Sequence, residues 1–194
     1  MVIVKQPTHG LGILRMIVFA TMLTAYTQAS CWAQTEPRAA EHQVKAAFLY
    51  KFLSFVDWPP QSFERADSPL VIGVLGADEL AEELLATVNE RTVRGHPLEV
   101  RKIRRGDSLA ELCVLFVGRT DSAALPGLLG ATKGRSLLTV TESDEALVQG
   151  STINFVVVDN KVRFDVALGP AEQRNLKISS RLLAVARRVL PNPS

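Results

Sequence analysis

The sequence predicts an α/β protein: one domain over residues 43–191, with a mostly parallel sheet flanked by helices and a C-terminal β-hairpin. Short apolar runs alternate with amphipathic segments through the first three quarters of the chain, which is typical of β-α-β units and a parallel sheet. Two further apolar runs are separated by Asp159-Asn160, a dipeptide that tolerates positive φ and suits a two-residue hairpin turn. The composition, 47% hydrophobic and 22% charged over 194 residues, fits a soluble chain of one domain.

The first 33 residues have the character of a secretory signal peptide. Lys5 and Arg15 are the only formal charges there, and a mostly apolar run from Met16 to Ala25 follows them. Cys31-Trp32-Ala33 supplies small groups at the two positions that a signal peptidase reads. We therefore expect cleavage before Gln34 and export to the periplasm.

Other interpretations of this segment were weighed. The segment that precedes the apolar run is long for a signal peptide, so the start codon could be Met16. Cleavage after Ala29 is another option. A transmembrane anchor needs about 20 apolar residues, and this run is shorter and interrupted by threonines. Ala29-Ser30-Cys31 suits a bacterial lipobox, but Gln28 stands where that motif has Leu or a similar residue, which disfavours a lipid anchor at Cys31.

Removal of the leader changes the charge and the cysteine count. The leader holds two bases and no acids, so the rest of the chain has 20 bases, 20 acids and no net charge, which argues against a basic groove for nucleic acid. Cleavage also removes Cys31 and leaves Cys113 without an intramolecular disulfide partner. Because Cys113 lies within an apolar run, we expect a buried, inert thiol rather than one that pairs between chains. The polar residues 34–42 are expected to form a flexible segment.

The stretch from Val44 to Pro60 predicts a long opening helix. Its apolar residues recur at three- and four-residue spacing with polar residues between them, as in a helix that buries one stripe. Trp58-Pro59-Pro60 ends the helix, because proline lacks an N–H and disfavours a helical conformation in the residue before it. Trp58 is then either a core residue or the partly exposed half of a binding surface. The stripe comprises Val44, Phe48, Phe52 and Phe55, and the polar side comprises Lys45, Lys51 and Ser54.

The remaining elements follow from hydrophobic period and from turn residues. The expected strands are 70–76, 98–103, 112–117, 136–140, 152–158 and 161–168. The expected helices are 79–89, capped by Asp78, then 107–111, 122–129, 143–148, a short helix opened by Pro170, and a long final helix over 178–190.

The motifs for catalysis and metal binding are weak. Gly73-Val74-Leu75-Gly76 follows a strand, but the spacing is not GxGxxG and no P-loop lysine follows, so turn glycine is favoured over a phosphate cradle. His42 and His96 have no metal-ligand partner at helical or turn spacing. A Cys–His nucleophile would require Cys113, in the middle of an apolar strand. The sequence thus predicts no enzyme, no metal and no cofactor.

A compact exported domain of this kind is better suited to binding. Phe55 and Trp58 at the end of the opening helix, and Arg119, Asn154 and Arg163 near predicted strand ends, are the candidate binding residues. For the three polar residues, the alternative is surface solvation and hairpin pairing.

A family resemblance runs through the same segments. The stretch Val44–Phe52 continuing into Phe55–Pro59 resembles the opening signature of the YfiR-like periplasmic proteins, the DUF4154 family. The further matches, in order, are Val71–Gly76, Cys113–Gly118, Leu138–Val140, Gly150 with Ile153–Phe155, Val162–Val166 and Leu176–Leu183.

The resemblance implies a sheet flanked by helices and a periplasmic regulator. In this family the regulator holds a membrane-bound diguanylate cyclase inactive by contacting its periplasmic sensor domain, and an outer-membrane lipoprotein sequesters the regulator. Cyclic di-GMP and biofilm formation are thereby controlled. Homodimers and small ligands such as tryptophan or nucleotides are also implied. The alternative function is a periplasmic protein that binds a small aromatic or nucleotide ligand on its own.

The chain departs from the family pattern in two ways. The family's regulation by intramolecular disulfides is in doubt here, because the processed chain would hold only Cys113. Many members also carry Asn near the end of the second hairpin strand, where this chain has Ala167. Any polar contact of that Asn is absent.

Overall fold

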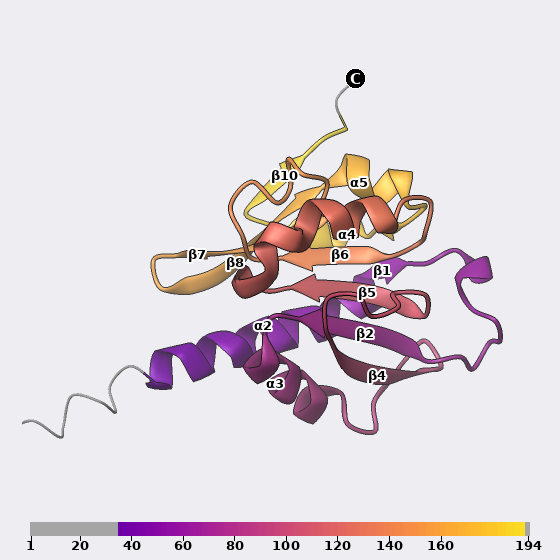
Figure 1. Cartoon of the computed structure of the whole chain (residues 1–194), viewed down its shortest axis with the longest axis horizontal. Coiled ribbons are helices and arrows are strands. Elements are labelled where there is room, and N and C mark those ends of the chain that lie inside the picture. Colours follow the sequence, from indigo (N-terminus) through magenta and orange to yellow (C-terminus); the bar gives the residue numbers. More distant parts are fainter. Residues whose placement is uncertain (1–34, 193–194) are drawn as a thin grey trace, which may run out of the picture. The chain divides into compact units, whose positions relative to one another are not determined.

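The computed structural model describes residues 35–192, and those from Ala40 onward form one compact unit (Figure 1). The predicted signal peptide, its alternative start and cleavage sites, and Cys31 fall outside the described residues. The helices are α2 (Thr35–Phe55), α3 (Asp78–Val88), α4 (Leu125–Ala131), α5 (Leu168–Gln173) and α6 (Ser180–Leu183), with 3-10 turns η1 (Pro60–Ser62) and η2 (Arg119–Ala124). The strands are β1 (Val56–Asp57), β2 (Leu70–Leu75), β3 (Thr92–Val93), β4 (His96–Ile103), β5 (Leu112–Val117), β6 (Leu138–Thr141), β7 (Ile153–Val158), β8 (Lys161–Ala167), β9 (Lys177–Ile178) and β10 (Arg188–Leu190).

Eight strands form one sheet in the order β10-β8-β7-β6-β5-β2-β4-β3, which confirms the predicted α/β fold. In the sheet, β4, β2, β5, β6 and β7 lie side by side in this order and each neighbouring pair is parallel. Strand β10 is parallel to β8. The β7–β8 hairpin is antiparallel, and its turn residues Asp159 and Asn160 have φ of 49° and 56°, as the two-residue turn requires. A separate antiparallel pair, β1 with β9, follows the end of α2.

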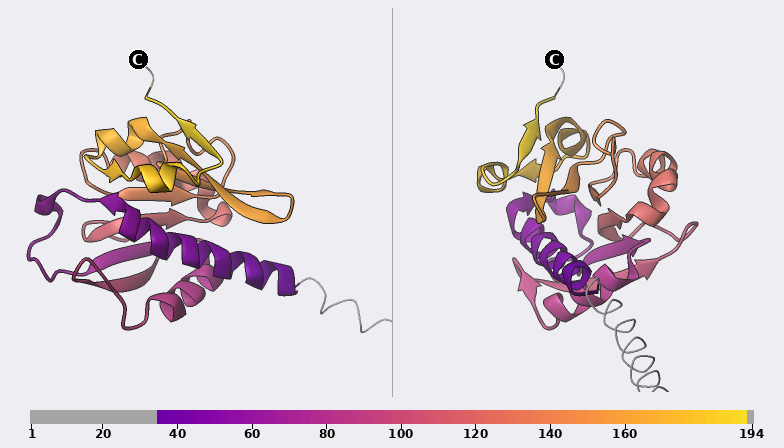
Figure 2. Two further views of the ribbon diagram at one scale, coloured as in Figure 1. Left: turned by 180° about the vertical axis from the view of Figure 1, so that it is seen from behind. Right: turned by 90° about the vertical axis from the view of Figure 1, so that its left-hand side faces the viewer.

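Alternating side chains of β2 contribute to two apolar cores on opposite faces of the sheet. Leu70, Ile72 and Val74 join the core that contains α2 and α3 residues, whereas Val71 and Leu75 join the core beneath α4. Figure 2 shows α2 and α4 on opposite sides of the sheet. A strand that is buried on both faces has the continuous apolar sequence from which β2 was predicted.

Helix α2 begins earlier than the sequence pattern indicated. Residues 35–42, expected to be a flexible segment, lie in the first turns of the helix. Ala39, Ala40 and Glu41 are strong helix formers, and the pair of Glu41 with Lys45 at i,i+4 supports the same conformation. None of the helices in the described part of the chain is both long and apolar enough to cross a membrane.

The buried face of α2 differs from the predicted stripe at two adjacent positions, Val44 and Lys45. Val44, predicted to be inward, is 43% exposed, whereas Lys45, predicted on the polar side, is 1% exposed. Lysine can be buried here because its ammonium group forms ion pairs with Glu41 and Glu142. The hydrophobic period therefore located the helix but assigned one charged residue to the wrong face.

The predicted long final helix over 178–190 is wrong. Helix α6 has only one turn, and the chain then returns to the sheet as β10 beside β8. The backbone N–H of Arg187 donates to the carbonyl of Phe164 at 2.9 Å, which starts this return. Pairing with an open sheet edge, together with the buried carboxylate of Asp165, outweighs the helical period of this segment.

Three smaller predictions also require correction. Segments 107–111 and 143–148, predicted to be short helices, form irregular turns. Asp78 lies in the first turn of α3, and the N-cap is Ala77, whose side chain makes no capping hydrogen bond. An acidic residue in the first turn still interacts favourably with the positive end of the helix.

Candidate functional site

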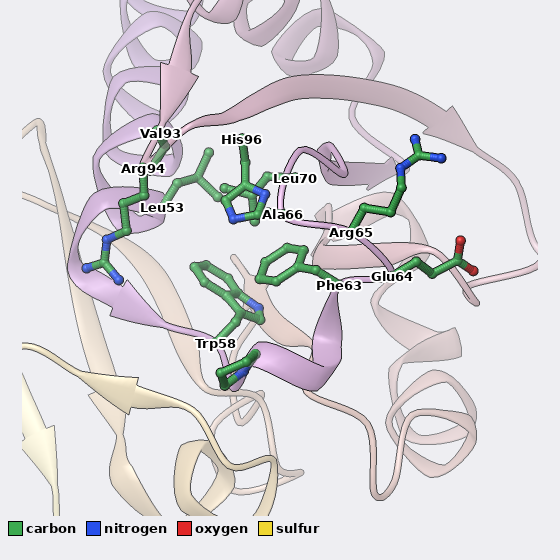
Figure 3. Close-up of a pocket in the computed structure, with 11 residues that line it drawn as sticks. Leu53, Trp58, Phe63, Glu64, Arg65, Ala66, Leu70, Val93, Arg94 and His96 are labelled. Carbon is green, nitrogen blue, oxygen red and sulfur yellow. The ribbon is translucent and has the colours of Figure 1, made fainter.

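The amino ends of β2 and β4 border a cavity of about 550 Å³, which we call the aromatic cavity (Figure 3). Its other borders are the end of α2, the end of β3 and the loop that connects β1 to β2. Parallel α/β sheets usually bind ligands at the carboxyl ends of their strands. The aromatic cavity lies at the opposite edge of the sheet. The lining residues are Leu53, Trp58, Pro60, Phe63, Glu64, Arg65, Ala66, Leu70, Val93, Arg94 and His96.

Trp58 forms one wall of the aromatic cavity. The indole is half-buried and packs against the apolar core, and its Nε1 donates a hydrogen bond to the carbonyl oxygen of Cys113 at 3.3 Å. This bond ties the loop after β1 to the start of β5. One side of the ring thus joins the core, and another borders the aromatic cavity.

Phe63 and His96 form a second wall. Their rings stack with centroids 4.2 Å apart and an interplanar angle of 24°. His96 Nδ1 lies 2.7 Å from the carbonyl oxygen of Ser68. A carbonyl can only accept, so Nδ1 carries a proton, and in the neutral ring Nε2 is left as an acceptor.

Arg94 fixes the rim of the aromatic cavity to the end of α2. It lies in the β3–β4 turn with φ of 54°, forms an ion pair with Asp57, and donates from Nη2 to the carbonyl of Ser54 at 3.1 Å. Carbonyls in the last turn of a helix lack intrahelical partners, so the guanidinium caps the C-terminus of α2. In Figure 3 it points away from the aromatic rings, as do the side chains of Glu64 and Arg65.

This arrangement can bind a flat or apolar group. Trp58 and Phe63 offer ring faces and edges, Leu53 and Leu70 contribute apolar surface, and His96 Nε2 can accept a hydrogen bond. Concave, mostly apolar sites with a few polar groups are typical of small-ligand pockets, and aromatic side chains often anchor protein partners.

Of the five predicted binding residues, Trp58 lines the aromatic cavity and the other four lie elsewhere. Phe55 is the last residue of α2, is half-buried against the core, and accepts a hydrogen bond from Ser179 N through its carbonyl. Arg163 is exposed on β8, opposite Val156. Phe55 therefore packs at the end of a helix, and Arg163 lies on the solvated face of a hairpin.

Arg119 and Asn154 meet neighbouring residues at the end of β6. Arg119 donates from Nε to the carbonyl of Glu142 at 3.1 Å, while the Thr141 hydroxyl donates to Oδ1 of Asn154 at 2.7 Å. Asn154 is buried, and Ser151 belongs to the same hydroxyl network. These contacts satisfy polar groups within the fold, which favours a structural role for both residues.

The sequence analysis missed Phe63, Arg94 and His96 as a group. His96 was considered only as a metal ligand, and Phe63 lay outside every expected helix and strand. An aromatic residue in an otherwise polar loop was the available signal, because such a ring must find an apolar partner. The stack with His96 could not be read from the sequence, since 32 residues of chain lie between Phe63 and His96.

The carboxyl ends of β2 and β5 are closed by backbone packing. Gly76 has φ of 68°, which confirms its interpretation as a turn glycine, and the carboxylate of Asp121 lies against it. A Cβ placed on Gly118 would lie 2.3 Å from the carbonyl oxygen of Gly76. The position where a phosphate would approach the helix is therefore occupied by the protein's own groups.

Among the described residues, Cys113 is a free thiol and is 5% exposed. Burial raises the pKa of this thiol, which reduces the reactive thiolate fraction. Within residues 35–192 no group of three or more His, Cys, Asp or Glu side chains is placed to hold a metal ion.

The comparison with protein families identifies the chain. The YfiR/HmsC-like family model (DUF4154) matches residues 42–187, which is most of the chain. The chain belongs to the YfiR/HmsC-like family. No curated protein matches it at a significant level. Membership in the YfiR/HmsC-like family supports a regulatory role in cyclic di-GMP signalling rather than an enzymatic one. The matched range includes every residue that lines the aromatic cavity.

Proposed function

We propose that this protein is a periplasmic repressor of a membrane-bound diguanylate cyclase and acts by direct contact with the periplasmic sensor domain of that enzyme. The observation that carries the proposal is the YfiR/HmsC-like match over residues 42–187. Repression lowers cyclic di-GMP and restrains biofilm formation. An outer-membrane lipoprotein that sequesters the repressor would relieve it.

The aromatic cavity is the surface that best suits this contact. Trp58 and Phe63 are half-buried, so each keeps part of its ring available to a partner while the rest is held by the fold. Rigid aromatic side chains of this kind carry much of the free energy of binding in protein interfaces. The stack on His96 and the bond to Cys113 hold the two rings in place before binding.

The cellular test compares intracellular cyclic di-GMP in a strain lacking this protein, the same strain complemented with the wild type, and the strain complemented with Phe63→Ala. Deletion is expected to raise cyclic di-GMP, and the wild type is expected to restore it. Phe63→Ala, exported at the same level, should restore it only in part. Unchanged cyclic di-GMP in a deletion strain whose parent exports the protein would contradict the proposal.

The contact itself is tested with purified components. Periplasmic sensor domains from the cyclases of the same cell are immobilised, and binding of the protein is measured in solution. We expect one sensor domain to bind, with Phe63→Ala at least about tenfold weaker, a loss of about 1.4 kcal/mol. Arg163→Ala, on the distant hairpin, is the matched control and should bind as the wild type does. Binding to none of the domains would refute direct contact.

A second candidate function is binding of a small aromatic or nucleotide ligand without a protein partner. The volume of the aromatic cavity, about 550 Å³, lies within the range of small-ligand pockets. With Trp32→Phe, Trp58 is the sole tryptophan of the chain. A ligand in the cavity should then produce a saturable change in tryptophan fluorescence. Absence of any change across a panel of aromatic amino acids and nucleotides would remove this candidate.

A further inference from the structure

A second cavity of about 530 Å³, which we call the arginine cavity, lies at the amino ends of β2 and β5. Its floor is apolar and consists of Val71, Leu112 and Cys113, which are all almost fully buried. Its walls come from the loop between η1 and β2, from β4, and from the residues just before β5 and β6. Unlike the aromatic cavity, it is lined by three arginines, and this composition points to an anionic ligand.

Among the described residues that line the arginine cavity, Arg135 is the arginine without a carboxylate partner. It is half-buried in the segment before β6, and it forms no ion pair within residues 35–192. Its Nη2 donates to the carbonyl of Ala110, which restricts the orientation of the guanidinium. The guanidinium has five N–H donors in a rigid fork that matches a carboxylate or a phosphate, so its remaining donors can bind such a group.

The other two arginines of the cavity differ in how firmly they are held. Arg101, on β4, forms ion pairs with Glu99 and Glu111, so the protein itself balances its charge. Arg65 pairs with Asp67, and the two side chains are 76% and 78% exposed. An ion pair as exposed as this one holds its partners weakly, so Arg65 is available to an incoming anion. In Figure 3 its side chain points away from the rings of the aromatic cavity.

The strand order gives the arginine cavity two chemically different ends. Strands β2 and β5 lie between β4, which carries Arg101, and β6, which follows Arg135. At the usual spacing of strands, the two ends are about 14 Å apart. The first end holds the balanced pair of Arg101 with Glu111, whereas the second holds the positive charge of Arg135. An anionic group is therefore favoured at the Arg135 end.

Carboxylates in the lining restrict the rest of the ligand. Glu64 and Glu111 both line the cavity, and Glu64 has no ion-pair partner in the described part of the chain. A carboxylate accepts hydrogen bonds from hydroxyl groups but repels a second negative charge. The lining thus suits a molecule with one anionic end and several hydroxyl groups.

We propose that the arginine cavity binds a small hydroxylated anion, a sugar acid or a sugar phosphate, with its anionic group on Arg135. Its hydroxyl groups donate to Glu64 and Glu111, and its C–H groups pack on the apolar floor. The volume of the cavity lies within the range of small-ligand pockets. This site differs from the aromatic cavity in its position and in the chemistry of its ligand, and it does not rest on the proposed function.

The test is isothermal titration calorimetry of the exported protein with glucuronate, glucose 6-phosphate, glucose, acetate and inorganic phosphate. We expect at least one of the two sugar anions to bind, and the tighter one identifies the anionic group as carboxylate or phosphate. Glucose should not bind, because it has no charge for Arg135. Acetate and inorganic phosphate should bind at least about tenfold more weakly than the sugar anion, because they lack its hydroxyl groups. Failure of both sugar anions to bind, or equal binding of glucose, would overturn the proposal.

Charge-matched variants locate the site. Arg135→Gln should weaken binding of the sugar anion at least about tenfold. Arg163→Gln, on the distant hairpin, removes the same charge outside the cavity and should bind as the wild type does. Glu64→Ala should weaken the sugar anion but not inorganic phosphate, since it removes both a hydroxyl acceptor and a repelling charge.

Thermal melting shows whether each variant is folded. If Arg135→Gln does not fold, Arg135→Lys takes its place, because lysine keeps the charge and can still donate to the Ala110 carbonyl. Lysine lacks the planar fork, so binding of the sugar anion should still fall about fivefold. Unchanged binding in a folded Arg135 variant, or an equal loss in Arg163→Gln, would overturn the assignment of the anion to this cavity.

Discussion

Lys45 and Glu142, which are 97 residues apart in the chain, form an ion pair in which the lysine is almost fully buried. Lys45 also pairs with Glu41 on the preceding turn of α2, and the backbone N–H of Arg119 donates to Glu142 Oε1 at 3.2 Å. Helix α2 is thereby joined to the carboxyl end of β6. A buried ammonium is tolerated only when its charge is balanced in this way.

Replacing Lys45 should be strongly destabilising. In Lys45→Met the stem volume is kept, but Glu41 and Glu142 lose their shared cation in a mostly buried setting. We expect a loss of about 3–5 kcal/mol in the free energy of unfolding, measured by urea denaturation. Lys51→Met, at an exposed position of the same helix, is the control and should change stability by less than about 0.5 kcal/mol. Equal effects of the two variants would show that the buried pair contributes little.

The ion pair of Lys45 with Glu41 predicts that the stability of the fold depends on pH in the acid range. Burial alone would raise the pKa of the Glu41 carboxyl, but Lys45, Arg119 and His42 outweigh it, so this pKa lies below its usual 4.5. A lowered folded-state pKa contributes stability that is present above pH 4.5 and is lost as the pH falls through the folded-state value.

The measurement for this acid dependence is the urea midpoint of the wild type and of Lys45→Met across a pH series. The difference between the two proteins should be largest above pH 4.5 and should shrink in more acidic buffer. A difference that is constant with pH would mean that Lys45 does not set the titration of Glu41.

Trp58 combines a packing role with a hydrogen bond, so two substitutions separate them. Trp58→Ala removes a half-buried indole and should cost about 2 kcal/mol, less than the 3–5 kcal/mol of a fully buried aromatic residue. Trp58→Phe keeps a ring in the cavity wall but loses the bond to the Cys113 carbonyl, which should cost about 1 kcal/mol. Thermal melts of both variants check these values. If Trp58→Ala has the same melting temperature as the wild type, the indole does not belong to the core.

The two C-terminal arginines should differ in their effect on stability. Arg187 donates to both oxygens of the buried Asp165 carboxylate, whereas Arg188 makes a single contact at 3.2 Å. Arg187→Ala leaves that carboxylate with only the single contact from Arg188 and should cost about 2 kcal/mol in the free energy of unfolding. Arg188→Ala should cost less than about 1 kcal/mol. Guanidinium denaturation compares the two, and a larger effect of Arg188→Ala would contradict this order.

The sequence was most informative where one physical signal dominated. β2 and β5 are continuous apolar runs of strand length, and Asp159-Asn160 has the conformational freedom that the hairpin turn needs, so sheet and hairpin were both predicted. Lys45 was assigned to the wrong face because its burial depends on Glu142, a partner that helical period does not reveal. The segment 178–190 has a helical period, yet its end pairs with β8, and this long-range contact outweighs local propensity.

The candidate site was predictable only in part. Trp58 was identified because the two prolines after it end the opening helix, which places a large aromatic side chain at a helix end. Phe63, Arg94 and His96 come from separate loops, and only the folded chain brings them to one cavity. Arg119 and Asn154 were chosen as polar residues near strand ends, and this criterion does not distinguish a ligand contact from a hydrogen bond inside the fold.

The contact between Gly118 and Gly76 has a consequence for how variants of this chain would be interpreted. Any side chain at position 118 would collide with the Gly76 carbonyl, and both partners of that collision are backbone. In a saturation mutagenesis library, position 118 should therefore reject every substitution, alanine included, through loss of folded protein. Trp58 and Phe63 should instead tolerate other large aromatic residues at normal abundance. Protein abundance measured beside signalling output would thus separate a glycine that maintains the fold from aromatic residues that serve recognition.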